Sequence, residues 1–196
     1  MSTSPLPFSI RLGRGFKTDS ESVATSVRGE LGIARHDRLK ARALARYLGI
    51  KVRYPKDLPS VAAAGLDALI RPGTKQAWSA VFIKVVDRPG LVITNPHHTP
   101  AREESNIFHE LAHYICGHEP IRIDQIGGLP FREFDNEQER QAEYLGFALH
   151  LNRDSLFHSV KHGLNEAEIC SRYCASAQLV RHRMNITQVK RILRVA

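Results

Sequence analysis

Two histidines and a glutamate in the middle of the chain have the types and spacing that bind a metal ion and activate water on it. Residues 109–113 read His-Glu-Leu-Ala-His, the pattern H-E-x-x-H. Residues four positions apart lie one turn apart on the same helical face, so the imidazoles of His109 and His113 can bind one ion. Glu110 stands on the same turn, where a carboxylate can take a proton from a metal-bound water. The pattern predicts a zinc site in a hydrolase, with Glu110 as the catalytic base.

A catalytic zinc site needs a third protein ligand, because zinc in hydrolases usually takes three donors and one water. The best candidate is Glu139, which stands early in a second predicted helix with another carboxylate, Glu143, one turn later. Glu139 would bind the metal, and Glu143 would hold the second ring nitrogen of one histidine. Cys116, seven residues after His109 and on the same helical face, is the alternative ligand. Less favoured donors are Glu137, Glu143 and His118.

The competing interpretation of these residues is structural. His109 and His113 would then be polar residues of an amphipathic helix, and residues 139–143 would form a solvated acidic face. The presence of a suitable second helix favours the metal site over this interpretation. The other histidines considered are better explained as surface or packing residues. They are His97, His98, His118, His150 and His158.

The composition indicates a protein with one main hydrophobic core. The chain has 196 residues, of which 42% are hydrophobic, enough for one domain and a small appended lobe. No apolar run is long enough for a signal peptide or a membrane span, and three cysteines are too few for a disulfide framework. We therefore expect a cytoplasmic protein with reduced thiols and no membrane partner.

Hydrophobic periodicity and capping residues divide the chain into elements. Helices are predicted over residues 18–32, 37–48, 100–116, 136–151, 166–174, 176–184 and 187–194, with Asp135 as the cap of the fourth. Strands are predicted over residues 50–54, 77–86 and 91–94, the last two joined by a turn. Two segments are predicted to be irregular, residues 55–77 with a helical turn at 61–69, and the link around Gly127, Gly128 and Pro130.

These elements indicate an α+β fold that is mainly helical. A small β-sheet is expected to pack against the H-E-x-x-H helix, followed by a helical C-terminal lobe. We expect residues 1–18 to form an N-terminal arm, residues 19–152 the domain with the zinc site, and residues 153–196 the C-terminal lobe.

Four motifs resemble those of the ImmA/IrrE metallopeptidases, zinc-dependent enzymes found with bacterial and phage regulators. They are Ala45-Arg-Tyr-Leu-Gly-Ile-Lys-Val52, Val92-Ile-Thr-Asn95, Arg102-Glu-Glu-Ser-Asn-Ile-Phe-His-Glu-Leu-Ala-His113 and Glu139-Arg-Gln-Ala-Glu-Tyr-Leu-Gly-Phe-Ala-Leu-His-Leu-Asn152. The resemblance covers residues 15–184. It implies that His109, His113 and Glu139 are the zinc ligands and that Glu110 is the base.

The chain departs from the family pattern at several positions. Ser105 and Asn106 stand where the family has Phe and Thr, and Glu143 stands where it has Asn or Asp. His150 and Asn152 stand where the family has Leu and Pro, which changes the expected shape of the substrate groove and not the metal site. The resemblance also implies a regulatory protein substrate, such as a repressor or an antitoxin encoded nearby.

The C-terminal part of the chain is basic and resembles a helix-turn-helix segment. No acidic residue follows Ile169, and the basic residues after it are Arg172, Arg181, Arg183, Lys190, Arg191 and Arg194. With a net charge of +8, this makes DNA a candidate partner, with Arg181 and Arg183 as the side chains that reach the groove. The alternative is a helical end that only caps the metallopeptidase core.

Together, these observations predict a zinc-dependent metalloendopeptidase that cleaves a regulatory protein. Glu110 would remove the proton of the metal-bound water and return it to the leaving amine. The sequence does not assign the group that stabilises the oxyanion, for which the candidates are Tyr114, Tyr144, His97 and His98. Two alternatives stay open. One is a non-enzymatic regulator with structural zinc and a C-terminal lobe that binds DNA or protein, and the other is a degenerate peptidase kept as an interaction module.

Overall fold

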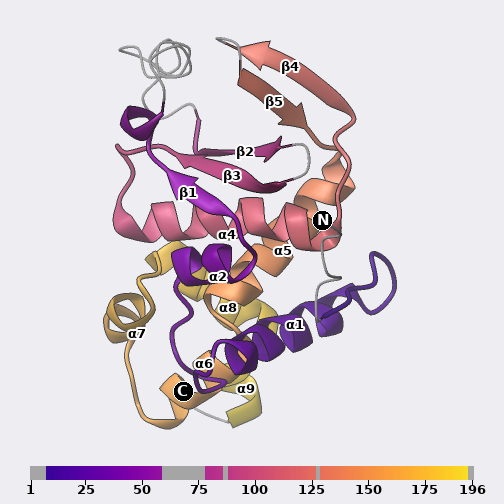
Figure 1. Ribbon diagram of the computed structural model, residues 1–196. Helices are drawn as coiled ribbons and strands as arrows, with labels where there is room; N and C mark the ends of the chain where they lie inside the picture. The colour runs from indigo at the N-terminus through magenta and orange to yellow at the C-terminus, as the bar shows by residue number, and fades with distance from the viewer. Residues whose placement is uncertain (1–7, 59–77, 86–87, 127–128, 194–196) are drawn as a thin grey trace.

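The fold of the chain is α+β and mainly helical, as predicted. The computed structural model describes residues 8–58, 78–85, 88–126 and 129–193. Its elements are α1 (Phe16–Glu30), α2 (Ala41–Tyr47), β1 (Lys51–Arg53), a 3-10 turn (Pro55–Asp57), β2 (Ala80–Val85), β3 (Arg88–Thr94), α4 (Pro100–Cys116), β4 (Arg122–Ile126), β5 (Leu129–Glu133), α5 (Asn136–His150), α6 (Arg153–Lys161), α7 (Glu166–Tyr173), α8 (Ala177–Thr187) and α9 (Val189–Leu193). The sheet lies on one side of α4, α5 packs against α4, and α1 packs against α5 (Figure 1).

The three-stranded sheet supplies the layer above α4. Its strand order is β1-β3-β2, with β1 parallel and β2 antiparallel to the central strand. Val52 and Phe82 both lie opposite Val92, and these three side chains face the main core together with the apolar face of α4. Ile93, next in the strand, packs with Trp78 on the opposite face. The small sheet therefore packs against the H-E-x-x-H helix, as expected.

Helix α4 has the bounds that the sequence predicts. The Thr99 hydroxyl accepts a hydrogen bond from the Arg102 backbone N–H, and Pro100 occupies the first turn, where its missing N–H costs nothing. The helix ends at Gly117, whose φ of 67° is a left-handed conformation that glycine adopts readily. Its buried residues are Ile107, Phe108, Leu111, Ala112, His113, Ile115 and Cys116.

Helix α5 lies unusually close to α4 at one glycine. The Asp135 side chain caps the helix by accepting hydrogen bonds of 2.8 Å from the N–H groups of Glu137 and Gln138. Further along, a Cβ at Gly146 would lie 3.3 Å from the backbone nitrogen and Cα of His109. Gly146 stands two turns after Glu139 on the same face, so this close contact also brings Glu139 to the histidines of α4.

The N-terminal elements differ in detail from the prediction. Helix α1 begins at Phe16, inside the predicted arm of residues 1–18, because Gly15 ends the preceding turn with a φ of 97°. Phe8 and Ile10 pack against the main core, so the described part of the arm is laid on the domain. The predicted helix over residues 37–48 is shorter and spans α2 only.

The link between α4 and α5 corrects another prediction. The link around Gly127, Gly128 and Pro130 was expected to be irregular, but β4 and β5 pair as an antiparallel ribbon, with Arg122 opposite Glu133 and Ile126 opposite Leu129. A Gly-Gly pair between two short runs is itself a hairpin signal that the sequence prediction missed. Residues 59–77, for which an irregular segment with a helical turn was predicted, lie outside the described residues.

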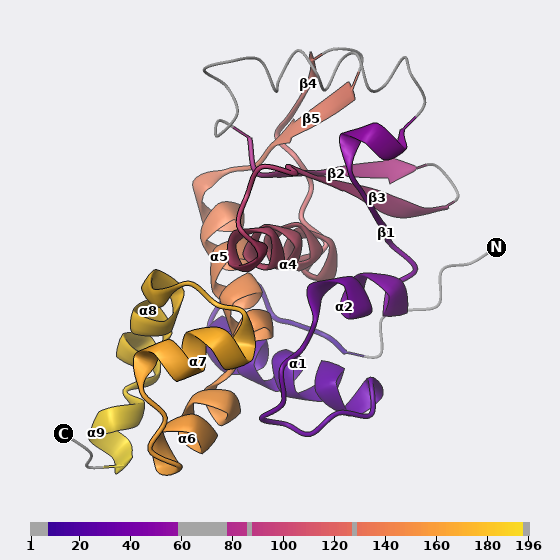
Figure 2. The same cartoon turned by 90° about the vertical axis from the view of Figure 1, so that its left-hand side faces the viewer.

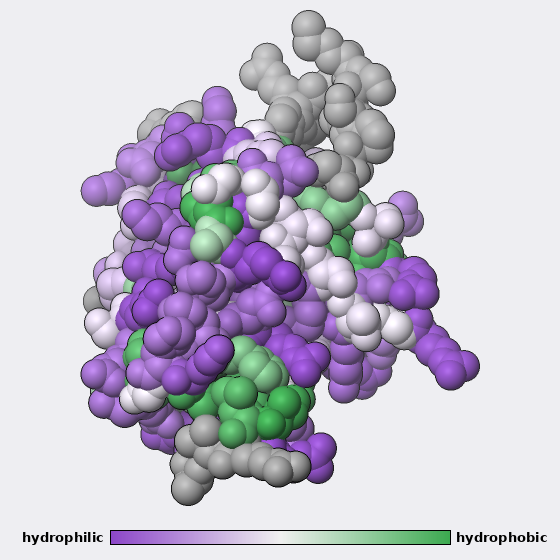
Figure 3. All heavy atoms as spheres, turned by 90° about the horizontal axis from the view of Figure 1, so that it is seen from below, coloured by the Kyte–Doolittle hydropathy of each residue, from purple (hydrophilic) through white to green (hydrophobic). Residues whose placement is uncertain are grey.

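The C-terminal helices α6 to α9 lie together (Figure 2). They surround a second group of buried side chains, separate from the main core. Its largest members include Tyr173 and Leu156, and the prediction missed α6, which contributes Leu156. Seen from below, the surface is mostly hydrophilic with a compact apolar patch (Figure 3). In the described part of the chain, no helix is long and apolar enough to cross a membrane.

The expectation that Arg183 reaches DNA is wrong. Its side chain is 0% exposed, and its Nε donates a 2.8 Å hydrogen bond to the carbonyl of Leu151, at the end of α5. Its guanidinium also forms an ion pair with Glu21 of α1. A charge held in this way ties the C-terminal helices to the main domain, because unpaired burial of a guanidinium would be costly. Arg181 does lie on the surface, where it pairs with Glu166.

Candidate metal centre

His109, His113 and Glu139 converge on one point, although the third residue comes from a different helix. One ligand atom of each residue lies within 4.8 Å of the others. The two histidine Nε2 atoms are 3.1 Å apart, and the Glu139 carboxylate lies 3.2 Å from Nε2 of His109 and 3.6 Å from Nε2 of His113. The spacing within α4 therefore brings His109 and His113 together, as the H-E-x-x-H motif predicts. The packing of α5 on α4 brings Glu139 to them as the third donor.

The separations between these donors fit a tetrahedral metal ion. Zinc bonds of 2.0–2.1 Å at tetrahedral angles keep neighbouring ligand atoms about 3.3 Å apart. The three observed separations, 3.1, 3.2 and 3.6 Å, lie on both sides of that value. Two imidazoles and one carboxylate are also a donor set of catalytic zinc sites, which keep a fourth position for water. The residues present thus fit a zinc ion.

Glu110 lies beside this centre in the wall of a cavity of about 610 Å³. The cavity wall also includes Glu139, Glu143 and Arg140 of α5. A smaller adjoining cavity lies between the metal centre and the residues of β2, and Glu110 and His109 line both. Glu110 therefore borders the space that a molecule entering from this side would occupy.

The charges around the centre are negative. Burial by itself would lower the pKa of His109, but the hydrogen bond to Glu139 and the charges of Glu110, Glu139 and Glu143 outweigh it and raise that pKa. A neighbourhood that favours the protonated imidazole favours any cation at the same place. The centre is thus electrostatically suited to a metal ion.

Two neighbours fix the orientation of His113. The ring of Phe134, from the turn before α5, stacks on it with centroids 3.9 Å apart and planes at 20°. Nδ1 of His118 lies 2.9 Å from Nδ1 of His113, on the ring edge opposite the ligand atom. Nε2 of His118 in turn lies 2.9 Å from the side-chain oxygen of Gln141. Sequence reasoning placed His118 among the surface or packing residues, although its position just after the Gly117 cap could have indicated a return toward the helix.

The other candidates, Glu143, Cys116 and Glu137, are not part of the converging group. Glu143 was expected to hold a ring nitrogen of His109 or His113. Nδ1 of His113 lies against His118 instead, and Glu143 lines the cavity together with His109. Cys116, the alternative ligand, is buried in the main core, and burial raises the pKa of its thiol to about 12. Glu137 pairs with Arg140 at 2.7 Å and is not part of the converging group.

The candidates for stabilising the oxyanion lie outside the described wall of this cavity. Among the described residues that line it, none is Tyr114, Tyr144, His97 or His98. His98 is hydrogen-bonded through Nδ1 to the side-chain nitrogen of Asn106 at 2.8 Å, and the Tyr114 ring packs on Phe82. Ser105 and Asn106, which the sequence marked only as departures from the family pattern, lie in this wall one turn before the ligand His109. Ser79, Asn136 and Arg140 are polar wall residues that the sequence did not mark.

Comparison with known proteins gives an independent result for the same part of the chain. The model of the peptidase family M78, described as IrrE N-terminal-like domain, matches residues 45–185. No curated protein and no solved structure matches the chain. The matched residues contain α4, α5 and all three converging donors, so the family match and the geometry refer to one site. The chain belongs to the IrrE N-terminal-like family of peptidases.

Proposed function

We propose that this protein is a zinc-dependent metalloendopeptidase that cleaves a regulatory protein, such as a repressor or an antitoxin encoded nearby. The observation that carries the proposal is the convergence of His109, His113 and Glu139 at separations that suit one tetrahedral zinc ion. Family membership supports a peptidase, and the negative surroundings of the centre support a cationic cofactor.

Each residue of the site would have a distinct role. Zinc, when bound, would polarise the scissile carbonyl and make its bound water more acidic. Glu110 would take the water proton and pass it to the leaving amine, since it shares the cavity wall with the donors. Phe134 and His118 would hold the His113 ring in position. Ser105 and Asn106 of α4 line the same cavity and would contact the substrate there.

Strand β2 would form one wall of the substrate site. In the described residues it pairs with β3, and β5 also packs against it. Residues Ala80, Val81 and Phe82 line the smaller cavity together with His109 and Glu110. A peptide that enters this cavity would lie between β2 and the metal centre.

A reducing, cytoplasmic location and a neighbour-encoded substrate are part of the proposal. Cys116, Cys170 and Cys174 are all free thiols, which suits a reducing compartment. A regulatory substrate follows from the family resemblance in the sequence. Contact with DNA would rest on Arg181, Lys190 and Arg191, which line a cavity on the C-terminal helices, and not on the buried Arg183.

The experiment that tests the function separates catalysis from metal binding. Glu110→Gln removes the base and leaves all three donors in place. Incubated with the regulatory proteins encoded beside its gene, the wild type should cleave one of them, and the variant should be slower by about 10²–10⁴-fold with unchanged zinc content. Glu119→Gln, at an exposed position just beyond the helix, is the matched control and should cleave normally.

The alternatives predict different results. A regulator with structural zinc would act on its partner or on DNA equally well with and without Glu110. A degenerate peptidase would bind zinc and cleave none of the neighbouring proteins. Either result would exclude the proposed activity while leaving the metal centre intact.

A further inference from the structure

His118 lies directly behind the metal centre, where the fold returns the chain after α4. The left-handed Gly117 ends the helix, and the backbone N–H of His118 bonds back to the carbonyl of His113 at 3.1 Å. This turn places the two rings against each other, with Nδ1 atoms 2.9 Å apart. His118 is 9% exposed, so the contact is shielded from water.

The hydrogen bonds around His118 have a single direction once a metal is bound. A metal on Nε2 of His113 requires the proton of that ring to be on Nδ1, which then donates to His118. Nδ1 of His118 must therefore be the acceptor, and its own proton is on Nε2. That N–H donates to the side-chain oxygen of Gln141 at 2.9 Å. Only one placement of the protons thus gives every ring nitrogen of His113 and His118 a bonding partner.

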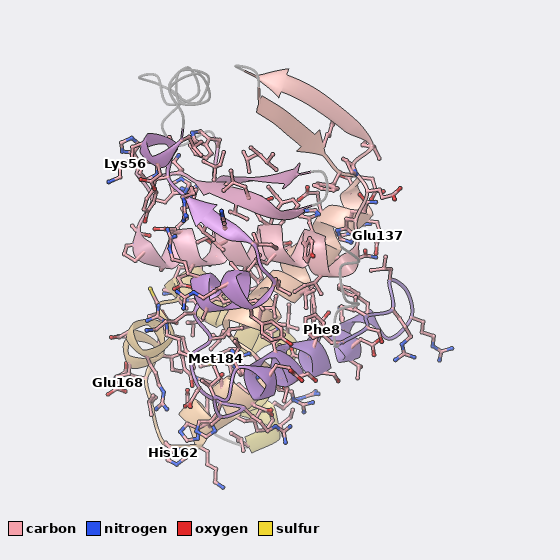
Figure 4. All side chains as sticks on the ribbon, in the orientation of Figure 1. Phe8, Lys56, Glu137, His162, Glu168 and Met184 are labelled. Carbon is pink, nitrogen blue, oxygen red and sulfur yellow. The ribbon has the colours of Figure 1, made fainter. Side chains whose placement is uncertain are left out.

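Gln141 anchors the far end of the series. Its side-chain nitrogen donates to the backbone carbonyl of Leu12 and to the carboxylate of Glu137, both at 3.1 Å. Gln141 is 5% exposed, and its amide oxygen must face His118 because both other partners are acceptors. Figure 4 labels Glu137 at the first turn of α5, on the side where the N-terminal arm with Phe8 runs. The amide is therefore fixed from three directions.

We propose that His118 and Gln141 are positioning residues for the metal centre. They hold His113 in the tautomer and ring orientation that present Nε2 to the ion. The physical reason is that a ligand that is already oriented loses less conformational freedom on binding, and a hydrogen bond to its second nitrogen raises its basicity. This inference rests on the metal site of the proposed function and not on the nature of its substrate.

The test compares two substitutions at the same position in the full-length protein. His118→Gln keeps an acceptor for His113 and a donor for Gln141, whereas His118→Leu keeps a similar volume and removes both. Zinc affinity is measured by competition with a chromophoric chelator. His118→Leu should bind zinc about 10–100-fold more weakly than the wild type, and His118→Gln should recover most of the loss.

Further measurements separate positioning from folding. Circular dichroism and thermal unfolding of the metal-free proteins show whether each variant is folded. If His118→Leu does not fold, the Gln141→Met variant tests the proposal instead, because it removes the acceptor for His118 and leaves both rings in place. It should weaken zinc binding in the same direction. The visible spectrum of bound cobalt should also change in the folded Leu and Met variants, since the orientation of a ligand ring changes.

Two results would overturn the proposal. One is a folded His118→Leu or Gln141→Met variant with the zinc affinity and cobalt spectrum of the wild type. The other is an equal loss in the Gln and Leu variants, which would show that the volume or fold at this position matters and its hydrogen bonds do not. A wild type that binds no zinc would contradict this inference and the proposed function together, whereas normal zinc binding and cleavage by the variants would contradict this inference alone.

Discussion

The Ser105 hydroxyl in the cavity wall lies 3.1 Å from Nδ1 of His150, a buried histidine near the end of α5. Nε2 of the same ring lies 3.1 and 3.2 Å from the carbonyl oxygens of Tyr173 and Cys174. Since Nε2 must donate to these carbonyls, Nδ1 is the acceptor and the Ser105 hydroxyl donates to it. One imidazole therefore connects the cavity to the C-terminal helices. The sequence resemblance leads us to expect apolar residues at both positions, where this chain has a polar pair.

Stability should depend on pH through His150. Burial lowers its pKa to about 4, well below the value of about 6.5 expected in the unfolded chain. A group whose pKa is depressed by folding stabilises the protein above the unfolded pKa and loses that contribution as the pH falls. Between pH 6.5 and 4, the free energy of unfolding should therefore fall by about 1.4 kcal/mol per pH unit from this residue, roughly 3 kcal/mol in all.

The comparison of the wild type with His150→Leu isolates this effect. Urea unfolding of both metal-free proteins is measured from pH 7 to pH 4. The variant should be less stable at pH 7, because the carbonyls of Tyr173 and Cys174 lose their donor, and the difference should shrink as the pH falls. Stability curves that stay parallel over this range would show that His150 does not titrate as its burial implies.

The contact between Gly146 and the backbone of His109 predicts a steep dependence on side-chain size. In Gly146→Val, the added branches would push α5 away from α4, so we expect a loss of about 1–3 kcal/mol in stability and weaker zinc binding. Gly146→Ala is the graded control, since one carbon at 3.3 Å is offset by a gain in helix propensity of about 1 kcal/mol. Chemical unfolding and zinc titration check both. Normal zinc affinity in the valine variant would mean that the closeness of the helices does not hold Glu139 in place.

The two neighbouring arginines of α8 should have unequal effects on stability. Arg183→Met removes a fully buried guanidinium from Glu21 and from the carbonyl of Leu151, which should cost about 3–5 kcal/mol. Arg181→Met breaks an exposed pair with Glu166, which should cost less than about 1 kcal/mol. Thermal and chemical unfolding measure both variants. Equal small losses would contradict the role of Arg183 as a connection between the C-terminal helices and α1.

Zinc should stabilise the folded protein through three donors and not through Glu143. At a free zinc concentration about 100 times the dissociation constant, ligand linkage contributes about 2.7 kcal/mol, or a rise of roughly 5–10 °C in the Tm. Glu139→Gln should remove most of this rise, and chelation should reverse it in the wild type. Glu143→Gln, one turn further along α5, is the matched control and should keep the shift. A loss of the shift in the Glu143 variant would make that carboxylate a ligand.

Local sequence was sufficient to predict the parts of the site that lie within one helix. The spacing of His109 and His113, the Thr99 and Pro100 start and the Gly117 end all act within a few residues, so α4 has the predicted bounds. The same holds for α5, whose Asp135 cap was predicted and is observed. The fold class followed from the succession of such elements.

Contacts between distant segments could be predicted only in part. Glu139 was correctly expected near the histidines from its position in a second helix, but the distance that makes it a donor depends on how closely α5 packs at Gly146. The role of His118 also depends on Gln141, 23 residues later in the chain. No periodicity encodes a pairing of that kind, because it follows from the mutual placement of two helices.

The two arginines of α8 show most clearly which property of the chain cannot be predicted from local sequence. The sequence by itself determined the positive charge of the C-terminal segment and the helices that carry it. Only the tertiary structure decided that Arg183 is buried against Leu151 and Glu21 while Arg181 faces solvent. The physical reason is that burial of a charge depends on the partners that surround it, and those partners come from α1 and α5, far away in the chain.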